Sequence, residues 1–176
     1  MNQKKINEII REHGLWLNDQ GGERADLSGS DLRGSNLRGS NLRGSNLHDS
    51  DLSYSDLRGS DLRGSDLIGS DLRGSNLRDS NLIGSNLRGI NLWNAIGNNR
   101  HIKTIQAGKY IVTYTSENMS IGCESHSIKD WWKFDDDTID AMDTGALEWW
   151  KVWKPILKKI IKVSPAEPTG YAEAEK

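Results

Sequence analysis

Cysteine and histidine side chains in the C-terminal third of the chain are the first candidates for chemistry. Cys123 is the only cysteine, His126 follows three positions later, and His101 is the other histidine nearby. Structural zinc needs four ligands, and a nucleophilic cysteine needs a histidine close in space, so this pair establishes neither. Because cysteine is among the residue types most often buried, we expect Cys123 to pack in the interior. We predict no catalytic residue and no metal ligand.

The acidic run DDDTIDAMD at residues 135–143 is the second candidate. A calcium-binding loop needs the spacing D-x-D-x-D-G, which this run lacks. Acidic side chains favour the first turn of a helix, so the run predicts a helix start. The chain also shows no phosphate-binding loop or dinucleotide fingerprint. We therefore predict no cofactor and no enzymatic activity.

Charged side chains recur with a fixed period between residues 25 and 94. This segment is fourteen consecutive five-residue units, each with Leu at its centre and Asp or Asn just before it. Ser stands two positions before most of these leucines, and Gly two positions after most of them. A period of five fits neither an α-helix nor a strand. A Leu register unbroken over 70 residues is not expected of a disordered Gly/Ser-rich linker, so we predict an ordered solenoid.

The side-chain types indicate how each unit is oriented. Leu and the small Ser before it should point inward, while Asp or Asn and the residue after Leu point outward. Gly should occupy corners where a positive φ is needed. One coil cannot bury its leucines alone, so stacked coils share a continuous Leu column. The inward Ser hydroxyls then need backbone hydrogen-bond partners.

These units closely resemble the pentapeptide-repeat family, whose consensus is A-(D/N)-L-x-x, with Ser replacing the usual Ala here. The resemblance implies a right-handed quadrilateral β-helix with four units per coil, so that residues 20 apart stack. At the usual spacing between strands, the fourteen units give a shaft about 17 Å tall. The C-terminal pattern YIVTYT…IGCESH…WWKF…IDAMDTGALEWWKVWKPIL also resembles a module that follows pentapeptide repeats in phage and prophage proteins.

The stacking implied by this resemblance arranges outward side chains in columns. The acidic column contains Asp31, Asp51 and Asp71, and the arginine column contains Arg38, Arg58 and Arg78. We predict that these six residues form an interaction surface. The units hold nine Asp and eight Arg without Lys or Glu, a net charge of −1. Complete mimicry of duplex DNA, which needs dense negative charge, is therefore not expected, and direct nucleic-acid binding is equally disfavoured.

The segments that flank the solenoid are expected to cover its ends. Residues 4–13 place Ile6, Ile9 and Ile10 on one helical face, and Gly14 is a plausible helix end. Residues 15–17, Leu-Trp-Leu, should complete this cap. Uncovered solenoid ends associate edge to edge, which explains the need for such covers.

Beyond the solenoid, the sequence predicts a small α+β module. HIKTIQ and YIVTYT read as a hairpin, MSIGC as a third strand, and Ser127 begins a short helix. Residues 145–162 form an amphipathic helix that Pro155 should kink or divide. Trp149, Trp150 and Trp153 lie in its apolar stripe. Core packing is the simplest interpretation; a dimer or partner surface and a membrane-surface helix remain alternatives.

The predicted fold class is mainly β, with four segments. These are a cap at 1–24, the β-helix at 25–97, the α+β module at 98–163 and a disordered tail at 164–176. One cysteine indicates a reducing compartment, no stretch is apolar enough to span a membrane, and the net charge is −2, so we expect a cytoplasmic protein.

The predicted function is non-enzymatic protein–protein interaction. The family resemblance implies a phage-borne inhibitor of a host DNA-acting or defence enzyme, like the pentapeptide-repeat proteins that imitate DNA and occupy gyrase. The alternative is a structural or adaptor protein that uses the solenoid as a rigid spacer. We expect a homodimer. Which protein is bound, and what the C-terminal module contributes, cannot be read from the sequence.

Overall fold

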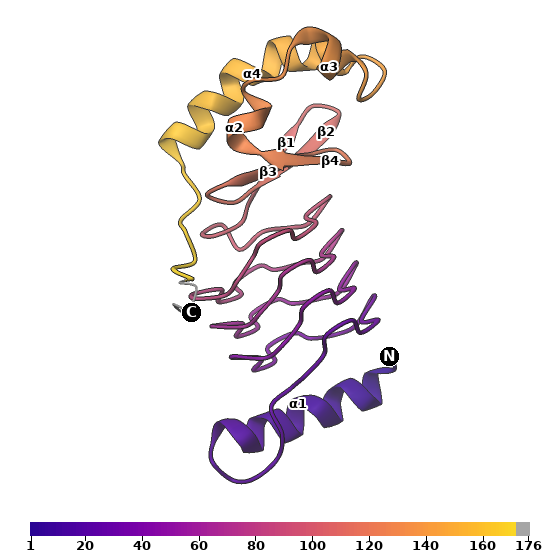
Figure 1. Ribbon diagram of the computed structural model, residues 1–176, viewed down its shortest axis with the longest axis vertical. Helices are drawn as coiled ribbons and strands as arrows, with labels where there is room; N and C mark the ends of the chain where they lie inside the picture. The colour runs from indigo at the N-terminus through magenta and orange to yellow at the C-terminus, as the bar shows by residue number, and fades with distance from the viewer. Residues whose placement is uncertain (172–176) are drawn as a thin grey trace, which may run out of the picture.

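The computed structural model describes residues 1–171 and shows an elongated molecule with three parts in line (Figure 1). A helix lies across one end, stacked coils form the shaft, and a sheet with helices covers the other end. The elements are α1 (Gln3–Leu17), β1 (Lys103–Ala107), β2 (Tyr110–Tyr114), β3 (Asn118–Ile121), β4 (Glu124–Ser127), α2 (Ile128–Trp131), α3 (Asp136–Asp140) and α4 (Ala146–Val163). None of these described helices is both long enough and apolar enough to cross a membrane.

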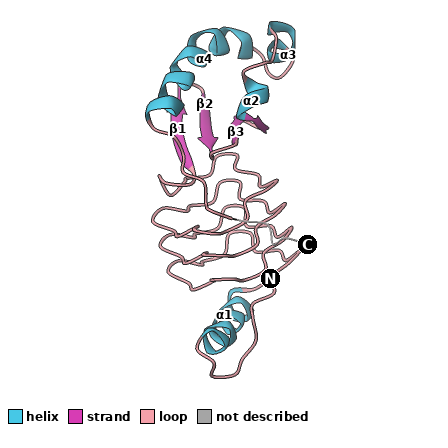
Figure 2. Ribbon diagram, turned by 60° about the vertical axis from the view of Figure 1, so that its left-hand side comes forward, coloured by secondary structure: helices cyan, strands magenta, loops and turns pink. Residues whose placement is uncertain are grey.

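The shaft repeats every 20 residues, as four five-residue units per coil require. Parallel bridges join Asp31 to Asp51 and Asp51 to Asp71, and the last bridge joins Asn76 to Ile96. Leu57 shows the pattern of the ladder, since its N–H donates to the carbonyl of Asn76 at 2.8 Å. Each side of a coil contributes a single bridge residue, so Figure 2 draws the coils as loops.

Leucine side chains fill the interior of the shaft, as predicted. Thirteen of the fourteen are buried and Leu87 is partly buried. The buried Ser hydroxyls mostly donate to the carbonyl of the preceding Leu, as Ser60 does to Leu57 at 2.8 Å. The exceptions are buried hydroxyls without a partner, at Ser35, Ser45 and Ser80. Replacing Ala by Ser therefore adds a hydrogen bond within most units but not in all.

The corners of the coils adopt positive φ, as the Gly positions predicted. Four corners hold other residues, including Tyr54 with φ 58°. The Tyr54 ring lies against Gly74 in the next coil, where an added Cβ would come within 2.6 Å of a ring carbon. A large side chain at one corner thus requires Gly at the corner stacked on it.

Helix α1 covers the first coil. Ile6 is 1% exposed and packs on the Leu column together with Ile9 and Ile10. The predicted helix end at Gly14 is wrong, because α1 continues to Leu17. Gly14 has no positive φ, and the Asn18 amide caps the helix by donating to the Gly14 carbonyl at 2.7 Å.

His13 closes the gap between α1 and the first coil, a role that the sequence did not indicate. Its ring is buried; Nδ1 accepts from the Ala25 N–H at 3.1 Å, and Nε2 lies 3.0 Å from the Arg43 carbonyl. This pairing needs the neutral ring with its proton on Nε2. Burial lowers the pKa of His13, and the charges of Arg24 and Arg43 lower it further, against the raising effect of the hydrogen bond to the Arg43 carbonyl.

Four antiparallel strands in the order β1-β2-β3-β4 form the sheet of the C-terminal module. The sequence analysis predicted three of them and missed β4, whose polar residues ESHS lack a strand-like apolar alternation. Helix α2 begins after Ser127, as predicted, since the Ser127 hydroxyl accepts from the Asp130 N–H at 3.0 Å. Asp135 caps α3 in the same way, accepting from the Thr138 N–H at 2.9 Å.

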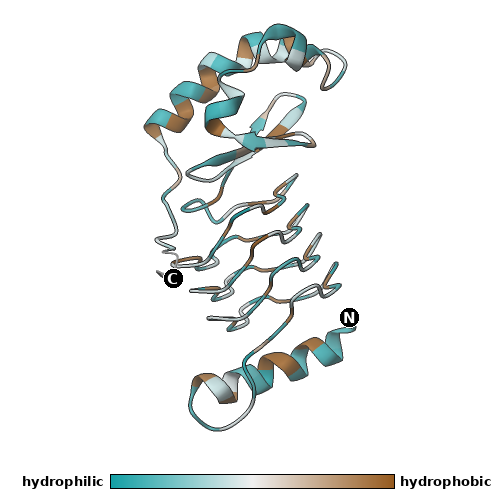
Figure 3. Ribbon diagram, in the orientation of Figure 1, coloured by the Kyte–Doolittle hydropathy of each residue, from teal (hydrophilic) through white to brown (hydrophobic). Residues whose placement is uncertain are grey.

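Helix α4 is one continuous helix of 18 residues, and no second helix starts at Pro155. Pro155 lies on the exposed side, where water can solvate the carbonyl that loses its intrahelical donor. Figure 3 shows apolar and polar segments alternating along α1 and α4, as amphipathic helices require. The apolar side of α4 packs toward the sheet.

The C-terminal module seals the last coil. Ile102 is fully buried at the end of the Leu column, and its carbonyl lies so close to Gly97 that a Cβ would collide with it. Asn98 fixes this turn: Oδ1 accepts from the N–H groups of His101 and Ile102, and Nδ2 donates to the Ser80 carbonyl at 3.1 Å. The module and the shaft therefore share a core.

Residues 164–171 contrast with the disordered tail that the sequence predicted. They return along the shaft (Figure 1), where Gly84 N–H donates to the Thr169 carbonyl at 2.6 Å. The Thr169 hydroxyl donates to the Ser85 carbonyl at 2.7 Å, and Arg100 pairs with Glu167 at 2.8 Å. The rest of the predicted tail, 172–176, lies outside the described residues.

Candidate interaction surface

Aspartate and arginine side chains pair within single units of the shaft. Asp precedes the central Leu and Arg follows it, so both project from the same side of the coil. Each pair joins residues two apart: Arg33–Asp31, Arg58–Asp56, Arg63–Asp61 and Arg73–Asp71. The Asp side chain also accepts from the N–H of the paired Arg, for example at 3.1 Å in Asp56. Much of the charge on the shaft is therefore neutralised locally.

The acidic column is stacked as predicted but is partly neutralised. Arg33 hydrogen-bonds Asp31 and holds the pKa of that carboxyl far below its usual range. Arg33 also lies 3.6 Å from Asp51, and Arg73 binds Asp71. The column therefore keeps only about one of its three negative charges unopposed.

The arginine column has the opposite balance. Arg58 binds Asp56, and its hydrogen bond is the main reason that the pKa of Asp56 falls to about 2, with a smaller contribution from the charge of Arg38. Arg38 and Arg78 follow Asn36 and Asn76, which offer no charge. Within the described residues neither guanidinium makes an ion pair. With Asp79 at the corner of the last unit, the three stacked units of this side hold three Arg and two Asp, a net charge of +1.

The tryptophans predicted as a dimer or partner surface lie mostly inward. Trp150 is 3% exposed and belongs to the core of the module, so it cannot offer surface in this protomer. Trp149 and Trp153 are partly buried, and the Trp149 indole donates to the Ala107 carbonyl at 2.7 Å. The exposed apolar side chains of α4 are instead Val152, Ile156 and Val163. A dimer through this helix stays a prediction.

Cys123 and His126 do not form a reactive pair in this arrangement. Cys123 is exposed in the β3–β4 turn, so its predicted burial is wrong. His126 packs edge-on against the rings of Trp131 and Phe134, at centroid distances of 5.2 and 5.0 Å, with Nε2 3.3 Å from Glu124. Across residues 1–171, no group of three or more His, Cys, Asp and Glu side chains is placed to hold a metal ion.

Comparison with known proteins identifies the shaft. The family model for pentapeptide repeats matches residues 23–59 and 55–94, in eight copies. No curated protein matches the chain. A pentapeptide repeat protein from Nostoc PCC 7120 of known structure is 29% identical over 49% of this chain and 73% of its own, with a TM-score of 0.28. A second, from the Arabidopsis thaliana thylakoid lumen, is 33% identical over 42% and 54%, with a TM-score of 0.21.

A third match covers less than half of the solved structure. HetL from Nostoc sp. strain PCC 7120, a pentapeptide repeat protein involved in heterocyst differentiation regulation, is 28% identical over 43% of this chain and 42% of HetL, with a TM-score of 0.27. The chain therefore spans between two fifths and three quarters of the length of these three structures. Residues 23–94 are therefore a block of pentapeptide repeats, the sequence pattern of proteins that fold as right-handed quadrilateral β-helices.

Proposed function

We propose that this protein is a non-enzymatic protein-binding module whose partner contacts the arginine column of the shaft. The proposal depends on one observation: Arg38 and Arg78 are the guanidinium groups of this column that form no ion pair within the described residues. Their backbone is fixed by the ladder, as the Gly59 N–H shows by donating to the Arg78 carbonyl at 2.9 Å. Rigidly spaced, weakly hydrated guanidinium groups suit carboxylates on a protein surface.

The acidic column is the neighbouring part of the proposed surface. Asp31, Asp51 and Asp71 keep a small negative excess beside the basic side, and this pattern gives orientation to a partner of complementary charge. Nucleic acid is uniformly negative, so the acidic column beside the arginine column would repel it. A protein with mixed surface charge is therefore the better match.

A narrower form of the proposal is a phage-borne inhibitor of a host DNA-acting or defence enzyme. It would use the acidic column as a partial imitation of DNA. The pairing of Arg33 and Arg73 with this column reduces the charge available for imitation. A supercoiling assay with gyrase tests this form, and absence of inhibition at excess protein excludes it for that enzyme.

An adaptor in which the shaft is a rigid spacer is the alternative. The locally neutralised Asp–Arg pairs favour it, because most of the shaft would then be solvated surface without a partner. Pull-down from a bacterial lysate separates the two functions when wild-type protein is compared with the double variant Arg38→Gln/Arg78→Gln. Loss of the captured protein supports binding by the shaft, and its retention supports the adaptor. Sedimentation of the purified chain tests the predicted homodimer.

A further inference from the structure

A small cavity opens between the sheet and helices α3 and α4 of the C-terminal module. Its volume is about 150 Å³, and strands β2 to β4 form one side while the two helices form the other. A cavity of about this size lined by apolar side chains accommodates benzene. The cavity is therefore large enough for a compact organic group of five or six heavy atoms.

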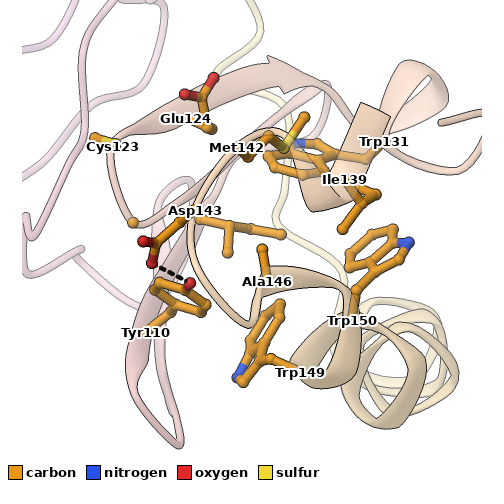
Figure 4. A pocket seen from close by; sticks show the side chains of 12 residues that line it. Tyr110, Cys123, Glu124, Trp131, Ile139, Met142, Asp143, Ala146, Trp149 and Trp150 are labelled. Atoms are coloured by element: carbon orange, nitrogen blue, oxygen red, sulfur yellow. Dashed lines mark hydrogen bonds between the residues drawn. The ribbon is translucent and has the colours of Figure 1, made fainter. Parts of the chain in front are cut away.

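Aromatic rings form most of its wall. Figure 4 shows Tyr110, Trp131, Trp149 and Trp150 around the opening, with Ile139 and Met142 completing the apolar lining. Trp149 meets Tyr110 edge-on at 4.9 Å and lies nearly parallel to Trp150 at 6.4 Å. At these separations the rings pack directly on one another, so they form one continuous aromatic wall beside the cavity.

Three of the four hydrogen-bond donors on these rings already have partners. Trp131 Nε1 donates to the Met119 carbonyl at 2.6 Å, and Trp149 Nε1 donates to the Ala107 carbonyl. The Tyr110 hydroxyl donates to Asp143 Oδ2 at 2.5 Å, shown dashed in Figure 4. The indole nitrogen of Trp150 is buried without a hydrogen-bond partner among the described residues, and it points away from this Tyr110–Asp143 pair in the same view. A guest in the cavity would find ring carbon and few free donors, which disfavours anions and carbonyl compounds.

Carboxylates stand at the mouth of the cavity. Glu124 and Asp143 both line it, and Lys109 Nζ lies 3.1 Å from Asp143 and neutralises only that one. His126 Nε2 lies 3.3 Å from Glu124, and with this histidine counted as neutral the mouth keeps a net negative charge in front of an aromatic wall. Aromatic faces combined with negative charge are the arrangement that recognises quaternary ammonium groups.

We propose that this cavity binds a quaternary ammonium group. A trimethylammonium group and the methylene next to it have about five heavy atoms together, one fewer than benzene, so they fit the cavity. It needs no hydrogen-bond donor or acceptor, which matches the wall, and its charge is attracted both by the rings and by Glu124. The shared chemistry is the head group, carried either by a free choline-like molecule or by a trimethylated lysine side chain.

Calorimetric titration of the full chain with choline tests the proposal. The matched probe is 3,3-dimethylbutan-1-ol, which has the shape of choline without its charge. We expect saturable binding of choline and at least about tenfold weaker binding of the alcohol, because only the cation gains from the ring faces. N-acetyl-trimethyllysine amide is the second ligand, and whichever of the two ammonium compounds binds more tightly identifies the source.

Two variants and one chemical probe locate the binding site. Ala146→Leu fills the cavity from α4 and should abolish binding, while Ala141→Leu adds the same carbons at an exposed position and should not. Glu124→Gln should weaken choline binding about threefold or more and leave binding of the neutral alcohol unchanged. The side chain is partly exposed, and glutamine can keep the contact with His126. Cys123, the only cysteine, lines the mouth, so choline should slow its reaction with a thiol reagent.

The proposal is overturned if neither ammonium compound shows saturable binding. It is also overturned if choline and the alcohol bind equally, since the aromatic wall would then act only as an apolar surface. If choline binds but leaves the reaction rate of Cys123 unchanged, the ligand lies outside this cavity, and the proposal is again overturned. If Ala146→Leu does not fold, the Glu124→Gln and Cys123 measurements decide the question.

Discussion

The guanidinium of Arg58 donates to the carboxylate of Asp56 two residues earlier, with Nε 2.8 Å from Oδ1. This relationship repeats wherever Asp and Arg flank a central Leu on the shaft. At Asn36 and Asn76, where Asn replaces Asp, the following Arg38 and Arg78 form no ion pair within the described residues. The choice between Asp and Asn before each Leu therefore decides where the shaft carries net charge.

Leu57→Asp should unfold the shaft. Leu57 is 0% exposed in the middle of the Leu column, and a carboxylate there would be buried without a partner. Leu57→Met conserves volume and should lower the free energy of unfolding by less than about 1.5 kcal/mol. Thermal unfolding followed by circular dichroism compares the two. A Leu57→Asp protein with wild-type stability would show that the inward assignment of Leu is wrong.

Ser45→Ala should stabilise the protein or leave it unchanged, whereas Ser60→Ala should destabilise it. Both side chains are buried, but the Ser45 hydroxyl has no partner and the Ser60 hydroxyl donates to Leu57. Removing an unsatisfied buried hydroxyl relieves a desolvation penalty, while removing a satisfied one costs about 1 kcal/mol. Urea unfolding of the two variants measures the difference. Equal effects would mean that the two hydroxyls have equivalent surroundings in solution.

Gly74→Ala should destabilise the shaft more than Gly59→Ala. Both glycines have positive φ, which costs a non-Gly residue about 1 kcal/mol, but only at Gly74 does an added Cβ meet the Tyr54 ring. The double variant Tyr54→Gly/Gly74→Ala removes the ring and should recover the excess loss. Denaturant unfolding of Tyr54→Gly, Gly74→Ala and the double variant gives the coupling between the two corners. Additive effects would indicate that the Tyr54 ring moves aside freely.

Stability should decrease as the pH falls below about 6.5, because of His13. Folding lowers the pKa of His13 from its ordinary value of 6.5, so the unfolded chain binds more protons just below that value. The stabilisation is complete above pH 6.5 and is lost as the pH drops toward the pKa of the folded state. Unfolding at pH 8 and pH 5 measures the loss.

His13→Gln is the control for this pH dependence. Glutamine can keep a donor and an acceptor near Ala25 and Arg43 but does not titrate. We expect the variant to lose less stability than wild type between pH 8 and pH 5. An identical loss in both proteins would assign the pH dependence to other groups.

The shaft could be predicted closely from the sequence because its period is local and repeated. Every coil restates the same Leu, Ser and Asp/Asn positions, so the stacking of Asp31 on Asp51 follows from the family's four units per coil. The contacts that close its ends depend on single residues. The burial of His13 between α1 and Arg43 rests on tertiary packing that no periodic pattern encodes.

The C-terminal module was predictable only in part for a similar reason. Helix caps such as Ser127 are local and were predicted, whereas β4 has no apolar alternation and forms because β3 presents an edge to it. The arginine column was predicted as a column. The sequence did not show which of its arginines form ion pairs. The structure shows that Arg58 pairs with Asp56, while Arg38 and Arg78 form no ion pair within the described residues.

The most direct measurement is partner capture from a bacterial lysate by three nuclease-treated proteins: wild type, Asn36→Asp/Asn76→Asp and Arg33→Gln/Arg73→Gln. The Asn36/Asn76 variant keeps every arginine but places a carboxylate two residues before Arg38 and Arg78. The Arg33/Arg73 variant removes two arginines of the acidic column that are already paired with Asp31 and Asp71. We predict that a protein captured by wild type is retained by the Arg33/Arg73 variant and lost by the Asn36/Asn76 variant. Equal capture of a protein by all three would contradict a protein-binding arginine column. The same conclusion would follow if untreated samples captured nucleic acid and the nuclease-treated samples captured no protein.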